Sequence, residues 1–227
     1  MKMKQTTLLL ISCMLMLVGA VETPADPVGS AHQLMRDFGV QLPKERKPAP
    51  LFSLPKLGGG EVSLADAYGK LVLLHFWATW CVPCRHEMPL LHRIEQDLDA
   101  QKFRMICVNV DRGDSDDVRR FIDKVSPAFH TLLDPAGSVR NRYVVRGLPT
   151  TYLIGQDGKI IGRIIGERDW TSPAAKFMLE ALLRSDGYGR EALIKPDLIS
   201  TSVAKRSANE KTVHDHVIVP AYVGWLR

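Results

Sequence analysis

Trp77-Ala78-Thr79-Trp80-Cys81-Val82-Pro83-Cys84 is the stretch from which the rest of this 227-residue chain is interpreted. The apolar run from Leu71 to Trp77 that leads into it predicts a buried strand. Apolar residues follow it at helical spacing: Met88, Leu91, Ile94 and Leu98. Two thiols therefore stand two residues apart where a strand gives way to a helix. Because the unpaired N–H groups and positive dipole of a helix start favour a thiolate, this stretch predicts a redox-active dithiol.

The two cysteines have structural alternatives, a permanent disulfide or half of a zinc site. A zinc site needs two further Cys or His ligands at matching spacing, and no second pair of closely spaced cysteines exists. Redox use is therefore favoured, and the sequence predicts neither a metal ion nor another cofactor. Cys107 lies within another apolar run, where we expect a buried and unreactive thiol.

Composition places few further limits on function. The length suits one domain with a sizeable core plus extensions. The formal net charge is +5, but basic and acidic residues are interspersed and form no dense basic run. A mixed, solvated surface is the simplest interpretation, so we expect no nucleic-acid partner.

The N-terminus has the pattern of an export signal. Two lysines precede an apolar run from Leu8 to Val18, and small residues end at Ala20, so we interpret residues 1–20 as a signal peptide. The run is short for a membrane span. A lipid anchor at Cys13 is the less favoured alternative, because apolar residues continue beyond it. Either route predicts a periplasmic protein in which disulfides can persist.

Two further segments lack the pattern of packed elements. Residues 21–48 contain four prolines and a charged cluster, and we interpret them as a linker with a short helix at His32–Phe38. Residues 187–227 show little periodicity, so we expect a largely irregular C-terminal extension that the dithiol chemistry does not need. His214-Asp215-His216 within it is interpreted as a solvated segment rather than a metal site.

Between these segments, strand and helix patterns alternate, which predicts an α/β fold. We expect strands at Pro50–Leu54, Glu61–Leu64, Leu71–Trp77, Phe103–Val110, Thr131–Leu133, Thr150–Ile154 and Ile160–Ile165. Besides the helix behind the thiols, we expect helical segments at Leu64–Tyr68, Ser115–Val125, Ala136–Tyr143 and Thr171–Arg184.

The order of strand, dithiol, helix, strand, helix, proline, hairpin and helix resembles the thioredoxin order. Separate segments resemble TlpA/ResA-like extracytoplasmic thioredoxins: Phe76–Pro89, Val108–Asp111, Arg146–Thr151 and Asp157–Arg163. The resemblance implies a thioredoxin-like domain over residues 49–186, with a central mixed sheet and helices on both faces. It also implies an exported thiol–disulfide oxidoreductase, usually a reductase, that serves cytochrome c maturation or copper-site assembly. The implied partners are a disulfide-containing protein substrate and a membrane thiol donor.

The resemblance also implies roles around the thiols. Leu148-Pro149 is expected to be a cis peptide facing the dithiol, with neighbouring backbone groups free to pair with a substrate segment. Cys81, at the helix start, is interpreted as the attacking thiolate, and Cys84 as the thiol that resolves the mixed disulfide. Trp80 is expected to shield the site.

Two side chains compete for the proton of Cys84. Glu87 lies three residues further on, on the same helical face, where family members place an acid. His75 lies six residues before Cys81, where thioredoxins carry an acid and TlpA-like proteins an amide. On a strand that is apolar on both sides it is expected to be buried and neutral, and thus able to accept a proton.

Other functions remain open from the sequence. A disulfide oxidase or isomerase would use the same cysteines at a different redox potential. A Cu(I)-binding metallochaperone would use Cys81, Cys84 and a histidine as ligands, since soft thiolates suit Cu(I).

Overall fold

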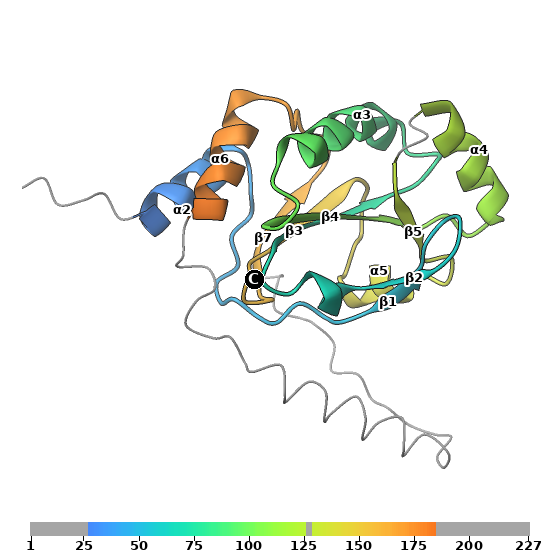
Figure 1. Ribbon diagram of the computed structural model, residues 1–227, viewed down its shortest axis with the longest axis horizontal. Helices are drawn as coiled ribbons and strands as arrows, with labels where there is room; N and C mark the ends of the chain where they lie inside the picture. Colours follow the sequence, from blue (N-terminus) through green and yellow to red (C-terminus); the bar gives the residue numbers. More distant parts are fainter. Residues whose placement is uncertain (1–26, 126–128, 185–227) are drawn as a thin grey trace, which may run out of the picture.

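A computed structural model of the protein describes residues 27–125 and 129–184 (Figure 1). The predicted signal peptide, Cys13, the segment His214-Asp215-His216 and the C-terminal extension lie outside these residues. None of the helices in the described part of the chain is long and apolar enough to cross a membrane.

A five-stranded mixed sheet forms the centre of the fold, in the order β5–β4–β3–β6–β7. Its strands are β3 (Leu71–Trp77), β4 (Phe103–Asn109), β5 (Thr131–Leu133), β6 (Thr150–Ile154) and β7 (Ile160–Ile165). The first three run parallel, whereas β6 lies antiparallel to β3, and β7 to β6. All residues of β3 are buried, because both of its faces are covered.

Helices cover both faces of this sheet, as the resemblance predicted (Figure 1). They are α2 (Pro27–Asp37), α3 (Val82–Asp97), α4 (Ser115–Val125), α5 (Ser138–Arg142) and α6 (Pro173–Arg184). Neighbouring side chains of β3 point to opposite faces of the sheet. Trp77 packs on Phe121 of α4, whereas Phe76 packs on Tyr143, which follows α5. A hairpin of β1 (Ser53–Pro55) and β2 (Glu61–Ser63) and a 3-10 helix, η1 (Leu64–Ala67), precede β3.

The expected strands β3, β5, β6 and β7 have the predicted bounds, but β1 is shorter than expected. It begins at Ser53 rather than at Pro50. The carbonyl of Pro50 accepts a hydrogen bond from the Tyr143 hydroxyl, and the carbonyl of Leu51 accepts one from Arg142. This segment is therefore tied to α5 by side chains instead of pairing in a sheet.

Two helices begin where an aspartate binds their free N–H groups. The carboxylate of Asp134 accepts hydrogen bonds from the backbone of Val139 and Arg140, so α5 starts at Ser138 and not at Ala136. At α4 the predicted start at Ser115 is confirmed, and the carboxylate of Asp114 accepts a hydrogen bond from the backbone N–H of Asp116 in the first turn.

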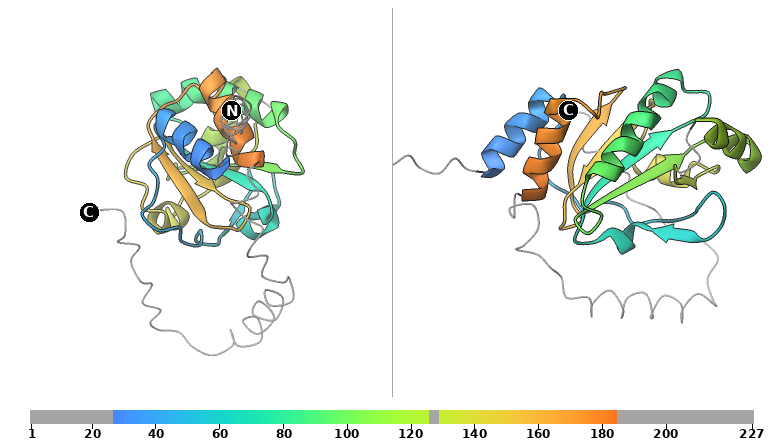
Figure 2. Two further views of the ribbon diagram at one scale, coloured as in Figure 1. Left: turned by 90° about the vertical axis from the view of Figure 1, so that its left-hand side faces the viewer. Right: turned by 45° about the horizontal axis from the view of Figure 1, so that its top comes forward.

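The structure gives residues 27–48 a different role from the predicted linker. Helix α2 starts at Pro27, earlier than the predicted His32, and packs beside α6 at the β7 edge of the sheet (Figure 2). Met35 is fully buried in the core. Gln41 exchanges backbone hydrogen bonds with Arg163 of β7. The folded unit therefore begins before residue 49.

We predict that Gly162→Ala weakens this contact between β7 and the α2 segment. A Cβ atom at Gly162 would lie 2.3 Å from Cγ1 of Val40 and 3.0 Å from Cε of Met35. Val40 is branched and cannot easily turn aside, so we expect a loss of about 1–3 kcal/mol in unfolding free energy, measured by urea denaturation. Gly147→Ala is the control, because its Cβ would meet no heavy atom within 4 Å. Equal stability of the two variants would contradict the packing.

Candidate active site

The turn between β3 and α3 is held by the end of the neighbouring strand. Val110 donates its backbone N–H to the carbonyl of Trp77 at 3.0 Å. The backbone N–H of Thr79 donates to Oδ2 of Asp111, also at 3.0 Å. Asn109 donates its side-chain amide to the same carboxylate oxygen at 2.9 Å. The loop that leads to the thiols is thus fixed at both its start and its middle.

Cys81 and Cys84 form a disulfide with an S–S distance of 2.06 Å. Cys81 caps α3, and its sulfur accepts a hydrogen bond from the backbone N–H of Cys84 at 3.3 Å. Pro83 stands in the first helical turn, which needs no proline N–H. Cys84 is fully buried, whereas Cys81 retains 5% exposure. The cysteine at the helix start is thus the more exposed of the two residues.

The two tryptophans near the thiols have different environments. Trp77 is fully buried, contacts Phe121 and Phe129, and donates its indole N–H to Oγ1 of Thr131 at 2.9 Å. Trp80 is 67% exposed, and Val82 beside it is 55% exposed. Trp80 therefore exposes apolar surface next to the disulfide and is not part of the core.

The Leu148-Pro149 peptide is cis, which confirms the expectation from the resemblance. Pro149 precedes Thr150, which pairs with Phe76 near the end of β3. This register places the cis peptide at the same end of the sheet as the turn that carries Cys81. The carbonyl of Pro149 accepts a hydrogen bond from Gly166 at 2.9 Å, which joins it to the end of β7.

Glu87 is a buried acid on the sheet-facing side of α3, the side that also carries Cys84. Its Oε1 accepts hydrogen bonds from the indole N–H of Trp170 and from the backbone N–H of Arg168 at 3.3 Å. Its Oε2 is buried and has no hydrogen-bond partner among the described residues. Burial raises the Glu87 pKa to about 7, although the two hydrogen bonds act in the opposite direction. Glu87 therefore exchanges a proton near neutral pH.

His75 lies fully buried on β3, directly opposite Cys107 on β4 and Thr151 on β6. Its Nδ1 is 2.9 Å from Oγ1 of Thr151, and its Nε2 has no hydrogen-bond partner among the described residues. Burial lowers the His75 pKa to about 3. The expected burial is thus confirmed, and a ring with so low a pKa is a weak proton acceptor. Of the two competing side chains, Glu87 has the pKa better matched to proton transfer.

Cys107 matches the expected buried thiol. Burial raises its pKa well above the ordinary range, and the nearby Glu95 and Glu87 raise it further. A thiol that is protonated and inaccessible is a poor nucleophile. We therefore expect Cys107 to take no part in thiol–disulfide exchange.

Metal binding finds little support in the described part of the chain. Over residues 27–125 and 129–184, no three His, Cys, Asp or Glu side chains are grouped so that they could hold an ion. The Cu(I) alternative thus lacks a third ligand within these residues, and His214 and His216 lie outside them.

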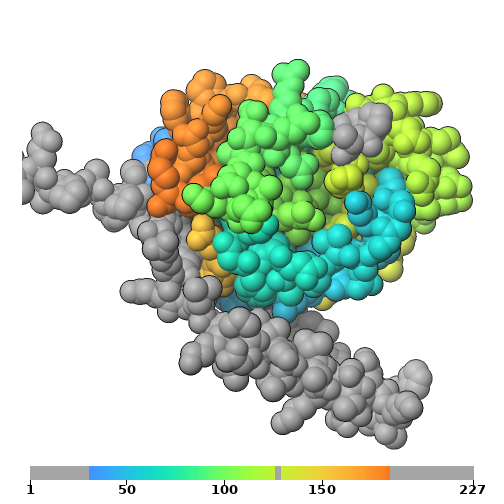
Figure 3. All heavy atoms as spheres, viewed as in Figure 1, coloured from blue at the N-terminus to red at the C-terminus, as the bar shows by residue number. Residues whose placement is uncertain are grey.

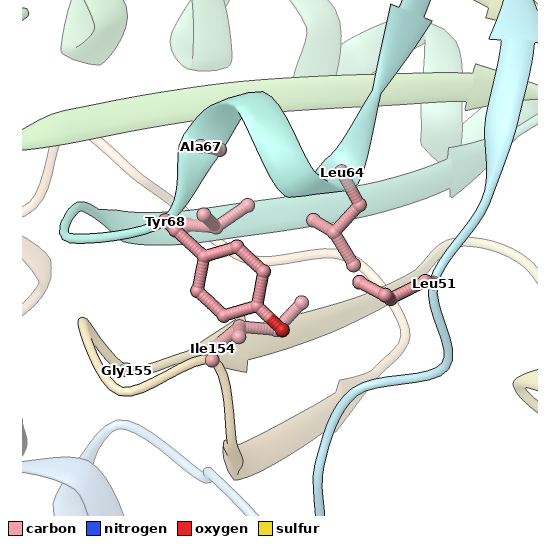
Figure 4. Close-up of a pocket in the computed structure, with 8 residues that line it drawn as sticks. Leu51, Leu64, Ala67, Tyr68, Ile154 and Gly155 are labelled. Atoms are coloured by element: carbon pink, nitrogen blue, oxygen red, sulfur yellow. The ribbon is translucent and has the colours of Figure 1, made fainter. Parts of the chain in front are cut away.

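A small apolar pocket lies away from the disulfide (Figure 4). Leu64, Ala67 and Tyr68 line it from η1 and the turn after it, together with Val72 and Ile154 from the sheet. Val72 points to the face opposite Leu73 and His75, since neighbouring strand residues alternate. The pocket therefore does not belong to the active site.

Sequence reasoning did not identify Trp170 and Arg168 as site residues. They lie in the loop between β7 and α6, far from the thiols in sequence, and no motif marks them. A tryptophan just before a helix is the sole signal, and it fits core packing equally well.

Comparison with known proteins bears on this site. The model of the AhpC/TSA family matches residues 46–163. The thioredoxin-like protein YneN of Bacillus subtilis is 40% identical over 127 residues, which cover 55% of this chain and 72% of YneN. The thiol-disulfide oxidoreductase ResA of the same organism is 35% identical over 129 residues, 56% of this chain and 71% of ResA.

Solved structures give the same result. A Chlorobium tepidum protein assigned as the thiol:disulfide interchange protein DsbE superposes with a TM-score of 0.57 at 34% identity, covering 62% of this chain and 98% of that one. A thiol-disulfide oxidoreductase of Bacteroides fragilis gives 0.51 at 29% identity, covering 60% and 99%. Both are proteins of thioredoxin-like fold, so the predicted fold is confirmed.

We predict that Glu87→Gln removes a pH dependence of stability. In the folded protein the Glu87 pKa is raised from 4.5 to about 7, so between these values the unfolded chain releases a proton that the folded chain keeps. Stability of the wild type therefore falls as pH rises through this window, by up to about 3 kcal/mol. Glutamine cannot titrate, so the variant should not show this loss.

The measurement is the unfolding free energy of the oxidised protein at about pH 4 and about pH 8. Glu61→Gln, which removes an exposed carboxylate of β2, is the matched control and should keep the wild-type difference. An unchanged difference in Glu87→Gln would show that the buried carboxyl does not carry this titration.

Proposed function

The chain belongs to the AhpC/TSA family and is a thiol–disulfide oxidoreductase of the ResA and DsbE type, and from this premise we propose that it is a periplasmic disulfide reductase. Its electrons come from the reduced Cys81/Cys84 dithiol, and its substrate is a disulfide-containing protein. Similarity to named relatives supports the reaction class. The surroundings of the thiols support the proposed direction of electron flow.

The observation that carries the proposal is the buried Glu87 on the same helix face as Cys84. Strong oxidants of this fold owe their potential to a stabilised thiolate in the reduced form. Here the backbone N–H of Cys84 points at the Cys81 sulfur and favours a thiolate there, but the negative charge of ionised Glu87 on the same helix face disfavours that thiolate. The reduced form is thus less favoured, and the pair gives up its electrons more readily.

The proposed cycle assigns a separate task to each thiol. The Cys81 thiolate attacks a substrate disulfide, forms a mixed disulfide and expels one substrate thiolate. Glu87 in its ionised form takes the proton of Cys84, and the Cys84 sulfur attacks Cys81. The Cys81–Cys84 bond forms and the second substrate thiolate leaves, so two electrons pass to the substrate. An external thiol donor then reduces the disulfide again.

The surroundings of Cys81 suit a protein substrate. Trp80 and Val82 expose apolar surface beside the accessible sulfur, and the cis peptide at Pro149 lies at the same end of the sheet. We place the protein in the periplasm on the strength of its N-terminal signal pattern, with a membrane thiol donor as partner. Cytochrome c maturation or copper-site assembly is the process that we assign to it on the basis of the family resemblance.

We predict that Cys84→Ser traps a mixed disulfide through Cys81, because the second attack is lost. Cys81→Ser should lower the reduction rate of a model disulfide by at least ~100-fold, since the buried Cys84 is a poor first nucleophile. Non-reducing electrophoresis and peptide mass mapping detect the trapped species. Cys107→Ser serves as the control and should behave as the wild type. Wild-type turnover by Cys81→Ser would refute the assignment.

The equilibrium redox potential of the Cys81/Cys84 pair tests the direction of transfer. Equilibration with glutathione or a dithiol buffer, followed by thiol trapping, should give a value below about −230 mV, toward the value of thioredoxin. A potential near −120 mV would instead make the protein an oxidase. The same titration on Glu87→Gln should give a less negative potential, because the opposing carboxylate is gone.

A further inference from the structure

We propose that Trp170 is a positioning residue for the proton transfer at Glu87. Its indole N–H holds Oε1 of the carboxylate and thereby leaves Oε2 as the oxygen that exchanges the proton. This inference rests on the acid–base role proposed for Glu87, but it concerns a different residue and a different atom.

The two oxygens of Glu87 have unequal surroundings. Oε1 accepts two hydrogen bonds, one from the indole of Trp170 and one from the backbone of Arg168 at 3.3 Å. Oε2 is buried and accepts none from the described residues. Trp170 itself is fully buried, so its N–H has no access to bulk water when it is not bonded to Glu87. A proton on this carboxyl group therefore belongs on Oε2, since a proton on Oε1 would displace two donors.

The indole is held in place by the segment that was expected to be a linker. The ring of Phe38 packs on the Trp170 ring with 5.3 Å between centroids and a 59° tilt. The carbonyl of Phe38 accepts a hydrogen bond from Nε of Arg168 at 3.3 Å. In the space-filling view, the orange atoms of α6 and of the loop before it border the green atoms of α3 (Figure 3). The residues that hold the indole lie outside residues 46–163, the part of the chain that the family model matches; they are Phe38, Arg168 and Trp170 itself.

Other ionisable groups face Glu87 from each neighbouring element. Glu167 in the loop before α6 raises its pKa, and Arg168 lowers it. Nδ1 of His86 on α3 lies 3.6 Å from Oε1 of Glu167. From the sheet below, Cys107 senses the Glu87 charge, but neither Cys107 nor the neutral His75 carries charge near neutral pH. Within the described residues, the hydrogen bonds to the Glu87 carboxylate come from the Trp170 indole and the Arg168 backbone.

Trp170→Phe removes the donor while keeping an aromatic ring against Phe38. A hydrogen bond to a charged group is lost, so the titration midpoint of Glu87 should rise by about one pH unit. The midpoint is read from the carboxyl carbon of 13C-labelled glutamate by NMR, with Glu87→Gln identifying the signal. Trp77→Phe is the matched control, because it removes an indole bond to Thr131 instead and should leave the midpoint in place. An unmoved midpoint in Trp170→Phe, or an equal rise in Trp77→Phe, overturns the proposal.

A second measurement uses the unaltered wild-type protein and does not depend on how the variant folds. The indole 15N–H signal of Trp170 should titrate with the same midpoint as Glu87, while that of Trp77 should not respond. In Glu87→Gln the Trp170 titration should vanish. A Trp170 signal that does not follow Glu87 refutes the positioning role. If it follows Glu87 while Glu87→Gln reduces disulfides at the wild-type rate, the positioning role stands and the acid–base role fails.

Discussion

Burial of strand β3 on both faces is the constraint on which the structure depends. All seven of its residues are buried, with β4 and β6 hydrogen-bonded on either side. A strand in this position must end at one edge of the core, and the turn that follows Trp77 carries both cysteines. The parallel partner β4 ends beside it and supplies Asp111 to hold the turn, whereas the antiparallel partner β6 begins there with the cis peptide. The site is thus assembled by three chain segments that meet at one edge of the sheet.

Burial has opposite effects on the pKa values of Glu87 and His75. It disfavours the charged form of each, so the pKa of Glu87 rises to about 7 and that of His75 falls to about 3. Both groups are consequently neutral over much of the acidic range. Only Glu87 changes its charge near neutral pH, where a thiol must lose or gain a proton. Desolvation thus favours Glu87 over His75 as the proton acceptor that we propose for Cys84.

The sequence was sufficient to predict the sheet and the dithiol, because both depend on local pattern. The apolar runs of β3, β6 and β7 define their own ends, and the spacing of Cys81 and Cys84 defines the start of α3. Helix α2 was harder to assign because prolines lie on both sides of the predicted helical segment and, among the side chains that the structure describes, those of Ala31 and Met35 are buried in the helix. The role of Trp170 could not be predicted at all, since it depends on a loop that reaches Glu87 across 83 residues of sequence.

These two omissions concern one physical arrangement. Burying a carboxyl oxygen that has no hydrogen-bond partner costs free energy, and Oε2 of Glu87 has none among the described residues. Firm contacts to the other oxygen, Oε1, hold the carboxyl group in this position. Trp170 supplies that contact, and Phe38 at the end of α2 fixes the indole ring. The segment before residue 49 is therefore more than a connection to the N-terminus. By packing on the loop that bonds Glu87, it helps to fix the surroundings of the buried acid on the helix face that also carries Cys84.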